Sequence, residues 1–315
     1  MFSRVKWFLF ALLLASILGL AGCRGATAVS PSGAPSQAPG STSVAPSDAP
    51  APTSTTEPTP TATPEPLAAR VNGMGIPLAE YEAELLQVHE AHKTLGKTST
   101  PEEQQQLALD NMIDTVLLAQ GAAEEDYAVS AEDLQAEIAA LAQQVGGEGA
   151  LQDWAARRGY DENAFRGALA RQMAAAWQRD HLAAAVPTAA EQVHARQILT
   201  IDADVAQRAL QYVQIPGTNF AAYAFQYDLQ TGGDLGWFPR GYLTQPAVEE
   251  AAFSLEPGQI SPVIESEVGY HILQVIAKEP SRALSPDARR VLQHKAIEAW
   301  LAERRAGAQI EIMLP

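Results

Sequence analysis

A proline-rich segment near the N-terminus limits how much of this chain can fold. Residues 26–66 contain ten proline and fifteen serine or threonine residues, three charged residues and no aromatic residue. So few apolar side chains cannot offset the conformational entropy that folding would cost. We therefore expect residues 23–66 to be a disordered linker, reaching up to roughly 100 Å in polyproline II geometry. A glycosylated stalk is equally compatible with this composition.

The residues before this linker have the pattern of an export signal. Arg4 and Lys6 precede an apolar run, Phe8 to Leu20, that is shorter than the roughly 20 residues needed to span a bilayer. The run ends in Leu-Ala-Gly-Cys, which contains the only cysteine, Cys23, and resembles a bacterial lipobox. The resemblance implies a signal peptide over residues 1–22 and a lipid on Cys23. That lipid would anchor the protein in the bacterial cell envelope, facing outside the cytoplasm. The alternative is an uncleaved signal anchor.

The composition excludes several functional classes. The 315 residues include 21 Lys and Arg against 37 Asp and Glu, which gives a formal net charge of −16. Such an acidic chain is a poor match for a phosphate backbone, so no nucleic-acid partner is expected. A single cysteine excludes a disulfide framework and a cysteine-based zinc site. The six histidines are scattered, so no metal site is predicted.

Helical patterns dominate residues 67–190. The region opens with a predicted hairpin over Val71–Ile76, because Asn-Gly is a favoured two-residue turn. Apolar residues then recur at helical spacing in several stretches. Thr100, Ser130 and Asp161 each precede such a stretch, as helix N-cap residues do. A mainly helical domain is expected here.

The pattern changes near Pro187. Strand patterns occur at Gln197–Ile201 and Gly269–Val275, with short helical patterns between them. This order indicates a small α+β domain around one sheet, which we place at residues 191–280.

Two long motifs within that domain resemble a known family. GGDLGWFPRG covers residues 232–241, and EEAAFSLEPGQISPVIESEVGYHILQV covers residues 249–275. Together they resemble the parvulin (PpiC-type) peptidyl-prolyl isomerases over about residues 194–278. The helical region resembles the N-terminal chaperone domain of the SurA and PrsA foldases, on fewer matching residues.

The resemblance also predicts where the last residues lie. Residues 281–315 contain a helical pattern and then an alternating stretch, Gln309–Leu314. In SurA-like proteins the last helix and strand return to the N-terminal domain, so this stretch should pair with the Val71–Ile76 hairpin. The expected fold class is therefore α+β. A mainly helical SurA-like domain is built from both ends of the folded region, and a small parvulin domain is inserted in it.

Parvulins hold the substrate proline in an apolar socket and need no cofactor. By resemblance, the socket positions fall on Leu235, Leu243, Val248 and Phe253. The family usually has Met and Phe where Leu243 and Val248 stand. This chain also has one extra residue between Gly241 and Phe253. Core packing is the alternative role for all four side chains.

The polar half of the site departs further from the family pattern. The second parvulin histidine falls on His271, and the Ser or Thr that hydrogen-bonds it falls on Ser266. The first histidine is replaced by Gln197, which can donate and accept hydrogen bonds but cannot become charged. The loop that carries an Asp or Cys in parvulins is shortened here. Asp228 is its only acid, while an ungapped alignment places Gln230 at that position.

Two functions remain open on these residues. The first is a membrane-anchored foldase that isomerises X–Pro bonds in exported polypeptides. The second is a chaperone whose parvulin domain binds unfolded, proline-containing chains with little turnover. In both, the partners are unfolded exported polypeptides, and the helical domain supplies a surface that holds them.

Overall fold

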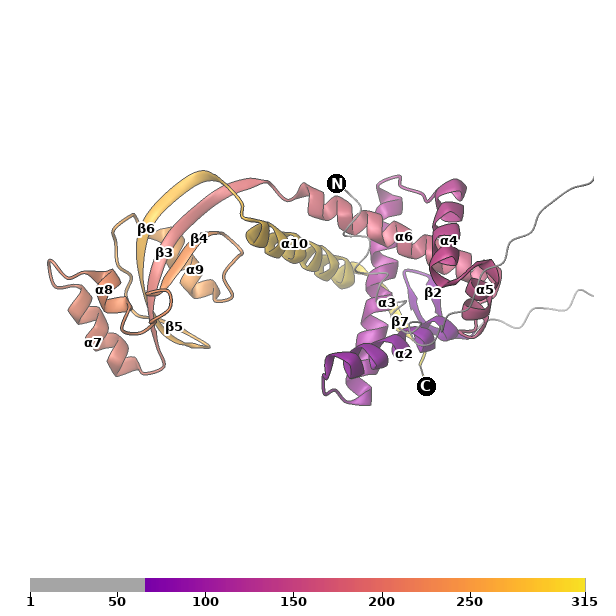
Figure 1. The fold of residues 1–315 in the computed structure, drawn as a ribbon, viewed down its shortest axis with the longest axis horizontal. Helices are drawn as coiled ribbons and strands as arrows, with labels where there is room; N and C mark the ends of the chain where they lie inside the picture. The colour runs from indigo at the N-terminus through magenta and orange to yellow at the C-terminus, as the bar shows by residue number, and fades with distance from the viewer. Residues whose placement is uncertain (1–65, 315) are drawn as a thin grey trace, which may run out of the picture.

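The computed structural model describes residues 66–314, which form a helical body and a smaller α+β body (Figure 1). The elements in chain order are β1 (Leu67–Val71), β2 (Met74–Pro77), α2 (Leu78–Leu95), α3 (Pro101–Glu124), α4 (Ala131–Val145), α5 (Glu148–Ala156), α6 (Glu162–Ala185), β3 (Ala189–Thr200), α7 (Ala203–Val213), α8 (Phe220–Ala224), β4 (Asp234–Pro239), α9 (Pro246–Ser254), β5 (Ile264–Ser266), β6 (Gly269–Ala283), α10 (Pro286–Gly307) and β7 (Ile310–Ile312). Within this part of the chain, no helix is both long and apolar enough to cross a membrane. The predicted signal peptide, the linker up to residue 65 and Cys23 lie outside the described residues.

Side-chain caps explain where the helices of the helical body begin. The Thr100 hydroxyl accepts a hydrogen bond from the backbone N–H of Glu103 (3.2 Å), and the Glu103 carboxylate accepts one from the Thr100 N–H (2.8 Å). This reciprocal pair satisfies two N–H groups that an uncapped α3 would leave without partners. Ser130 and Asp161 cap α4 and α6 in the same position. All three predicted caps are confirmed.

Both ends of the described chain meet in a three-stranded sheet of order β2-β1-β7. The central strand β1 pairs antiparallel with β2 and, on its other edge, with β7, where Val71 lies opposite Ile310 and Ala69 opposite Ile312. This confirms the predicted return of the C-terminal strand. The α+β body is therefore inserted between two parts of the helical body, as expected.

A charged contact fixes α10 to α3 just before β7. The guanidinium of Arg305 donates from Nε to Asp114 (2.6 Å) and from Nη1 to Asp110 (2.7 Å). Its Nη2 donates to the backbone carbonyl of Asp110 (2.9 Å). A planar guanidinium matches this fork of acceptors, so the contact sets the angle of α10 as well as its position.

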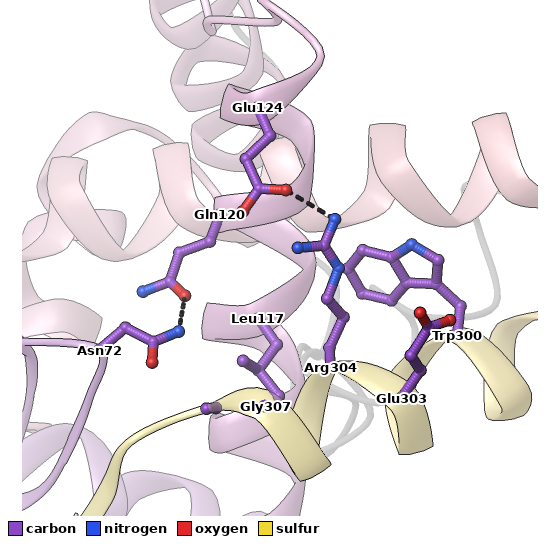
Figure 2. A pocket seen from close by; sticks show the side chains of 9 residues that line it. Asn72, Leu117, Gln120, Glu124, Trp300, Glu303, Arg304 and Gly307 are labelled. Atoms are coloured by element: carbon purple, nitrogen blue, oxygen red, sulfur yellow. Dashed lines mark hydrogen bonds and ion pairs between the residues drawn. The ribbon is translucent and has the colours of Figure 1, made fainter.

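A cavity of about 500 Å³ lies beside this contact, where α3, α10 and the first hairpin meet (Figure 2). Its polar side chains bond to one another: Asn72 donates to Gln120 (2.9 Å), and Arg304 pairs with Glu124 (2.6 Å). The ring of Trp300 packs so closely on Gly121 that a Cβ there would lie 2.5 Å from it. The cavity therefore lies at the interface between the N-terminal and C-terminal segments of the helical body.

The α+β body is built on a four-stranded antiparallel sheet of order β4-β3-β6-β5. Helices α7 and α8 cover one face, around Ile198 and Ile272. Helix α9 covers the other face, around Val193 and Leu273.

The two central strands are longer than the sequence predicted. β3 begins at Ala189 rather than Gln197, and β6 continues to Ala283. Their added segments pair with each other, from Ala189 opposite Ala283 onwards, and form the ribbon that leads to the helical body (Figure 1). The Gln192 amide adds hydrogen bonds to the carbonyl groups of Arg282 (2.8 Å) and Ala283 (3.2 Å). Sequence periodicity missed these segments because polar and charged residues interrupt the apolar pattern. Among the residues added to β3, only Val193 and Ala195 belong to an apolar cluster.

The Arg305 contact predicts a measurable loss of stability on truncation. The Arg305→Ala variant should lower the free energy of unfolding by about 1–2 kcal/mol, because two partly buried carboxylates lose their partner. Urea denaturation measures this change. The control is Arg290→Ala, because Arg290 and its partner Asp287 are both about three-quarters exposed. That variant should change stability by less than about 0.5 kcal/mol. Equal effects of the two variants would contradict the role given to Arg305.

Candidate active site

Three adjacent strands contribute one row of hydrogen-bonded side chains. His271, near the start of β6, lies between Gln197 of β3 and Ser266 of β5. Its Nδ1 is 2.8 Å from Gln197 Oε1, and its Nε2 is 2.7 Å from Ser266 Oγ. The structure therefore brings three of the four predicted polar residues into direct contact.

Strand register and one glycine place this row. Gln197 lies opposite Leu273, two residues along β6 from His271, so both polar side chains are on the same face of the sheet. The backbone N–H of Gln197 donates to the carbonyl of Gly233 (2.8 Å). Gly233 has φ +75°, and a Cβ there would lie 1.9 Å from the carbonyl oxygen of Gln197. The Gly-Gly pair before Asp234 therefore allows the chain to pass close enough to fix Gln197.

Burial disfavours the charged form of the His271 imidazole. Its side chain is only 3% exposed, and burial lowers the pKa of His271 below its usual value. A neutral imidazole has one donor and one acceptor nitrogen. Since Gln197 Oε1 can only accept, Nδ1 donates to it. The partner of Nε2 is the Ser266 hydroxyl, which also lies 3.2 Å from the Gly269 carbonyl oxygen. The three side chains thus form one continuous row of hydrogen bonds.

The four predicted socket residues meet in one apolar cluster on the α9 face of the sheet. Leu235, Leu243, Val248 and Phe253 pack there with Leu273, which lies on the same face as His271. Val248 and Phe253 are 2% and 5% exposed, whereas Leu235 and Leu243 are only half-buried. Leu235 and Leu243 are therefore accessible to a ligand, and they pack against the buried cluster that contains Val248 and Phe253.

Asp228, the fourth predicted polar residue, is not part of the row. Its carboxylate accepts hydrogen bonds from the backbone N–H groups of Gln230 (2.9 Å) and Thr231 (3.2 Å) and from the Thr231 hydroxyl. These bonds, the Thr231 hydroxyl first, lower the pKa of Asp228. Asp228 closes its own turn, and the described contacts do not connect it to His271.

The single histidine of β3 also lies apart from the row. His194 Nε2 is 2.8 Å from Asp234 Oδ1, and its ring lies against Trp237, which is directly opposite it on β4. Among residues 66–314, no group of three or more His, Cys, Asp or Glu side chains is placed to hold a metal ion.

Sequence reasoning missed Glu249, in the first turn of α9. Its Oε1 accepts a hydrogen bond from the backbone N–H of Gly241 (2.7 Å), and its Oε2 accepts one from the N–H of Leu243 (3.0 Å). An acidic residue in the first helical turn after Pro246 was a visible signal, but it suggested only a helix start.

Two family models match this chain. The model of the PPIC-type PPIase domain matches residues 181–277, and that of the SurA-like N-terminal domain matches residues 53–178. The chain contains both domains. The PPIase domain thus includes the hydrogen-bonded row and the apolar cluster, and the SurA-like domain includes most of the helical body.

Relatives with curated names match shorter segments. The foldase protein PrsA of Caldanaerobacter subterraneus subsp. tengcongensis is 43% identical over 89 residues, which are 27% of this chain and 28% of that protein. The chaperone SurA of Nitrosospira multiformis is 33% identical over 150 residues, which are 41% of this chain and 34% of that protein. The matches thus span about a third of these relatives or less. A crystal structure of peptidylprolyl isomerase PrsA from Bacillus anthracis is similar at 24% identity, covering 66% of this chain and 99% of that chain with a TM-score of 0.42.

The lowered pKa of His271 predicts how stability depends on pH. Between the folded pKa and the ordinary value of about 6.5, the unfolded chain binds more protons at this residue than the folded chain does. The contribution of His271 to stability is therefore present above pH 6.5 and is lost as the pH falls below it. The His271→Gln variant should lose less unfolding free energy between pH 7 and pH 5.5 than the wild type, as measured by urea denaturation. The same loss in both proteins would contradict a neutral, buried His271.

Proposed function

We propose that this protein is a foldase outside the cytoplasm that catalyses cis–trans isomerisation of X–Pro bonds in exported polypeptides. The observation that carries the proposal is the row Gln197–His271–Ser266 beside a half-exposed apolar surface in a PPIC-type domain. The names of the curated relatives, foldase and chaperone, support the same class of function.

The site suits a reaction that breaks no bond between heavy atoms. The X–Pro amide resists rotation because it has partial double-bond character, and its isomers exchange over tens to hundreds of seconds. An enzyme accelerates this rotation by binding the twisted amide more tightly than the planar one. Leu235 and Leu243 would hold the prolyl ring, and their apolar surroundings would favour the twisted amide, which is the less polar form.

The polar row would act on the carbonyl group that precedes the proline. Its neutral hydrogen bonds hold the Gln197 amide in one orientation, with Oε1 turned toward His271. The Nε2 group of Gln197 has no hydrogen-bond partner among residues 66–314 and can donate to this carbonyl oxygen. Gln197 would then take the role of the missing histidine as a donor, without a change of charge.

We assign the domains as the sequence suggested: a helical chaperone domain over 67–190, the isomerase domain over 191–280 and a returning segment over 281–315. The helical domain would hold the client chain. A cavity of about 120 Å³ between its helices supports this role, because apolar side chains dominate its walls, among them Leu141, Leu151, Trp154, Phe165 and Leu169. The net charge of −16 would disfavour acidic clients.

A specific observation favours a second candidate, a chaperone with little isomerase activity. Asp228, the only acid of the shortened loop, uses its carboxylate within its own turn. Gln197 cannot carry a charge. In this case the same apolar surface would bind proline-containing chains without accelerating their isomerisation.

Prolyl exchange in a short X–Pro peptide separates the two candidates. NMR exchange spectroscopy should show faster cis–trans exchange with the full-length protein in detergent micelles. His271→Ala should reduce this acceleration about tenfold or more, the effect of losing about 1.4 kcal/mol of transition-state stabilisation. The control His194→Ala, on the other face of the sheet, should keep it. Peptide shifts that report binding without faster exchange would exclude the isomerase and support the chaperone.

The proposed lipid anchor is tested at Cys23. The Cys23→Ser variant should move from the membrane fraction to the soluble fraction of the cells that produce it, because a serine cannot carry the thioether-linked lipid. The control Gly25→Ala lies outside the Leu-Ala-Gly-Cys motif and should stay with the membrane. A membrane-bound Cys23→Ser protein would exclude the lipid anchor and favour an uncleaved signal segment.

A further inference from the structure

The carboxylate of Glu249 holds the loop that carries Leu243. Gly241 and Leu243 point their backbone N–H groups at it from the chain between β4 and α9, at 2.7 Å and 3.0 Å. Hydrogen bonds from N–H groups to a carboxylate are roughly twice as strong as those to neutral acceptors. Two of them from alternate residues fix both the position and the direction of this short segment.

Other contacts leave the same loop few alternative paths. Gly241 has φ +83°, a conformation that side chains disfavour, and a Cβ there would lie 3.1 Å from the Leu292 side chain of α10. The guanidinium of Arg240 lies 4.2 Å from the centre of the Phe253 ring, which fits a cation–π contact. The loop is thus held at both sides of Gly241.

Leu243 depends on this loop for its place in the apolar cluster. It packs against the cluster of Val248 and Phe253 but remains half-buried, so its own packing leaves part of the side chain in contact with solvent. Unlike Val248 and Phe253, it belongs to no helix or strand that would set its direction. The two hydrogen bonds to Glu249 supply that constraint.

We propose that Glu249 is a positioning residue, whose carboxylate sets Leu243 as one wall of the site that binds the prolyl ring. This inference rests on the function proposed above. A role limited to stabilising the N-terminus of α9 is the simpler alternative. The chain offers a control with the same charge, since Glu250 follows Glu249 in α9 and pairs with the exposed side chain of Arg240 instead of with a backbone N–H group.

The test compares Glu249→Gln with Glu250→Gln in the full-length protein. Gln keeps the size of the side chain, but its amide nitrogen cannot accept, so one of the two loop N–H groups loses its partner. The readout is NMR exchange of an X–Pro peptide at increasing peptide concentration. Glu249→Gln should raise KM about fivefold with kcat nearly unchanged, because binding of the prolyl ring weakens equally in the planar and twisted states. Glu250→Gln should keep both constants within twofold.

A double-mutant cycle with Leu243→Ala separates positioning from general stabilisation. If Glu249 acts through Leu243, the double variant Glu249→Gln/Leu243→Ala should have the KM of Leu243→Ala alone. Effects that multiply, or equal KM values for Glu249→Gln and Glu250→Gln, would overturn the inference while the proposed function stands. If the wild type binds the peptide without turnover, the same comparison is made with Kd in place of KM. A wild type that neither binds nor accelerates exchange would overturn the proposed function, and this inference with it.

Discussion

The antiparallel pairing of β1 with β7 is the constraint on which the rest of the structure depends. It joins residues that are more than 230 positions apart, so the entropy of closing a very long loop must be offset by the contacts near the junction. Such contacts are the hydrogen bonds from Arg305 to the carboxylates of α3 and the packing of Trp300 on Gly121. Because the α+β body is an insertion, the chain must leave the helical body and return to it at neighbouring points. The pairing of Ala189 with Ala283 meets that requirement, because both crossings run side by side in one ribbon.

The same sheet that forms this ribbon organises the candidate site. Alternation along β3 and β6 places Gln197, His271 and Leu273 on one face and Ile198 and Ile272 on the other. Helix α9 covers the first face, so a neutral polar row and an apolar cluster are brought together without any charged group in the row. In the function proposed above, such a site would bind the twisted amide without a change of charge.

Local chemistry explains which features could be predicted from the sequence. The caps at Thr100, Ser130 and Asp161 depend on a few neighbouring residues, and they are confirmed. The return of the C-terminal strand came from resemblance, since no local pattern reveals a partner so distant in sequence. Asp228 shows the limit of counting residue types, because its carboxylate is used by the backbone of its own turn. Glu249 shows the opposite limit: its role depends on two N–H groups, which every residue except proline has.

The split helical body has a consequence for the order in which this chain can fold as it is synthesised. A polypeptide emerges from its N-terminal end, so β1 and β2 are available long before Ile310–Ile312. Until then one edge of β1 has no partner strand, and α3 lacks its hydrogen bonds with Arg305 of α10. The sheet of the inserted body is complete once residue 283 has emerged. The inserted α+β body, which begins later in the sequence, can therefore finish folding first. The helical body can be completed only after β7 has been synthesised.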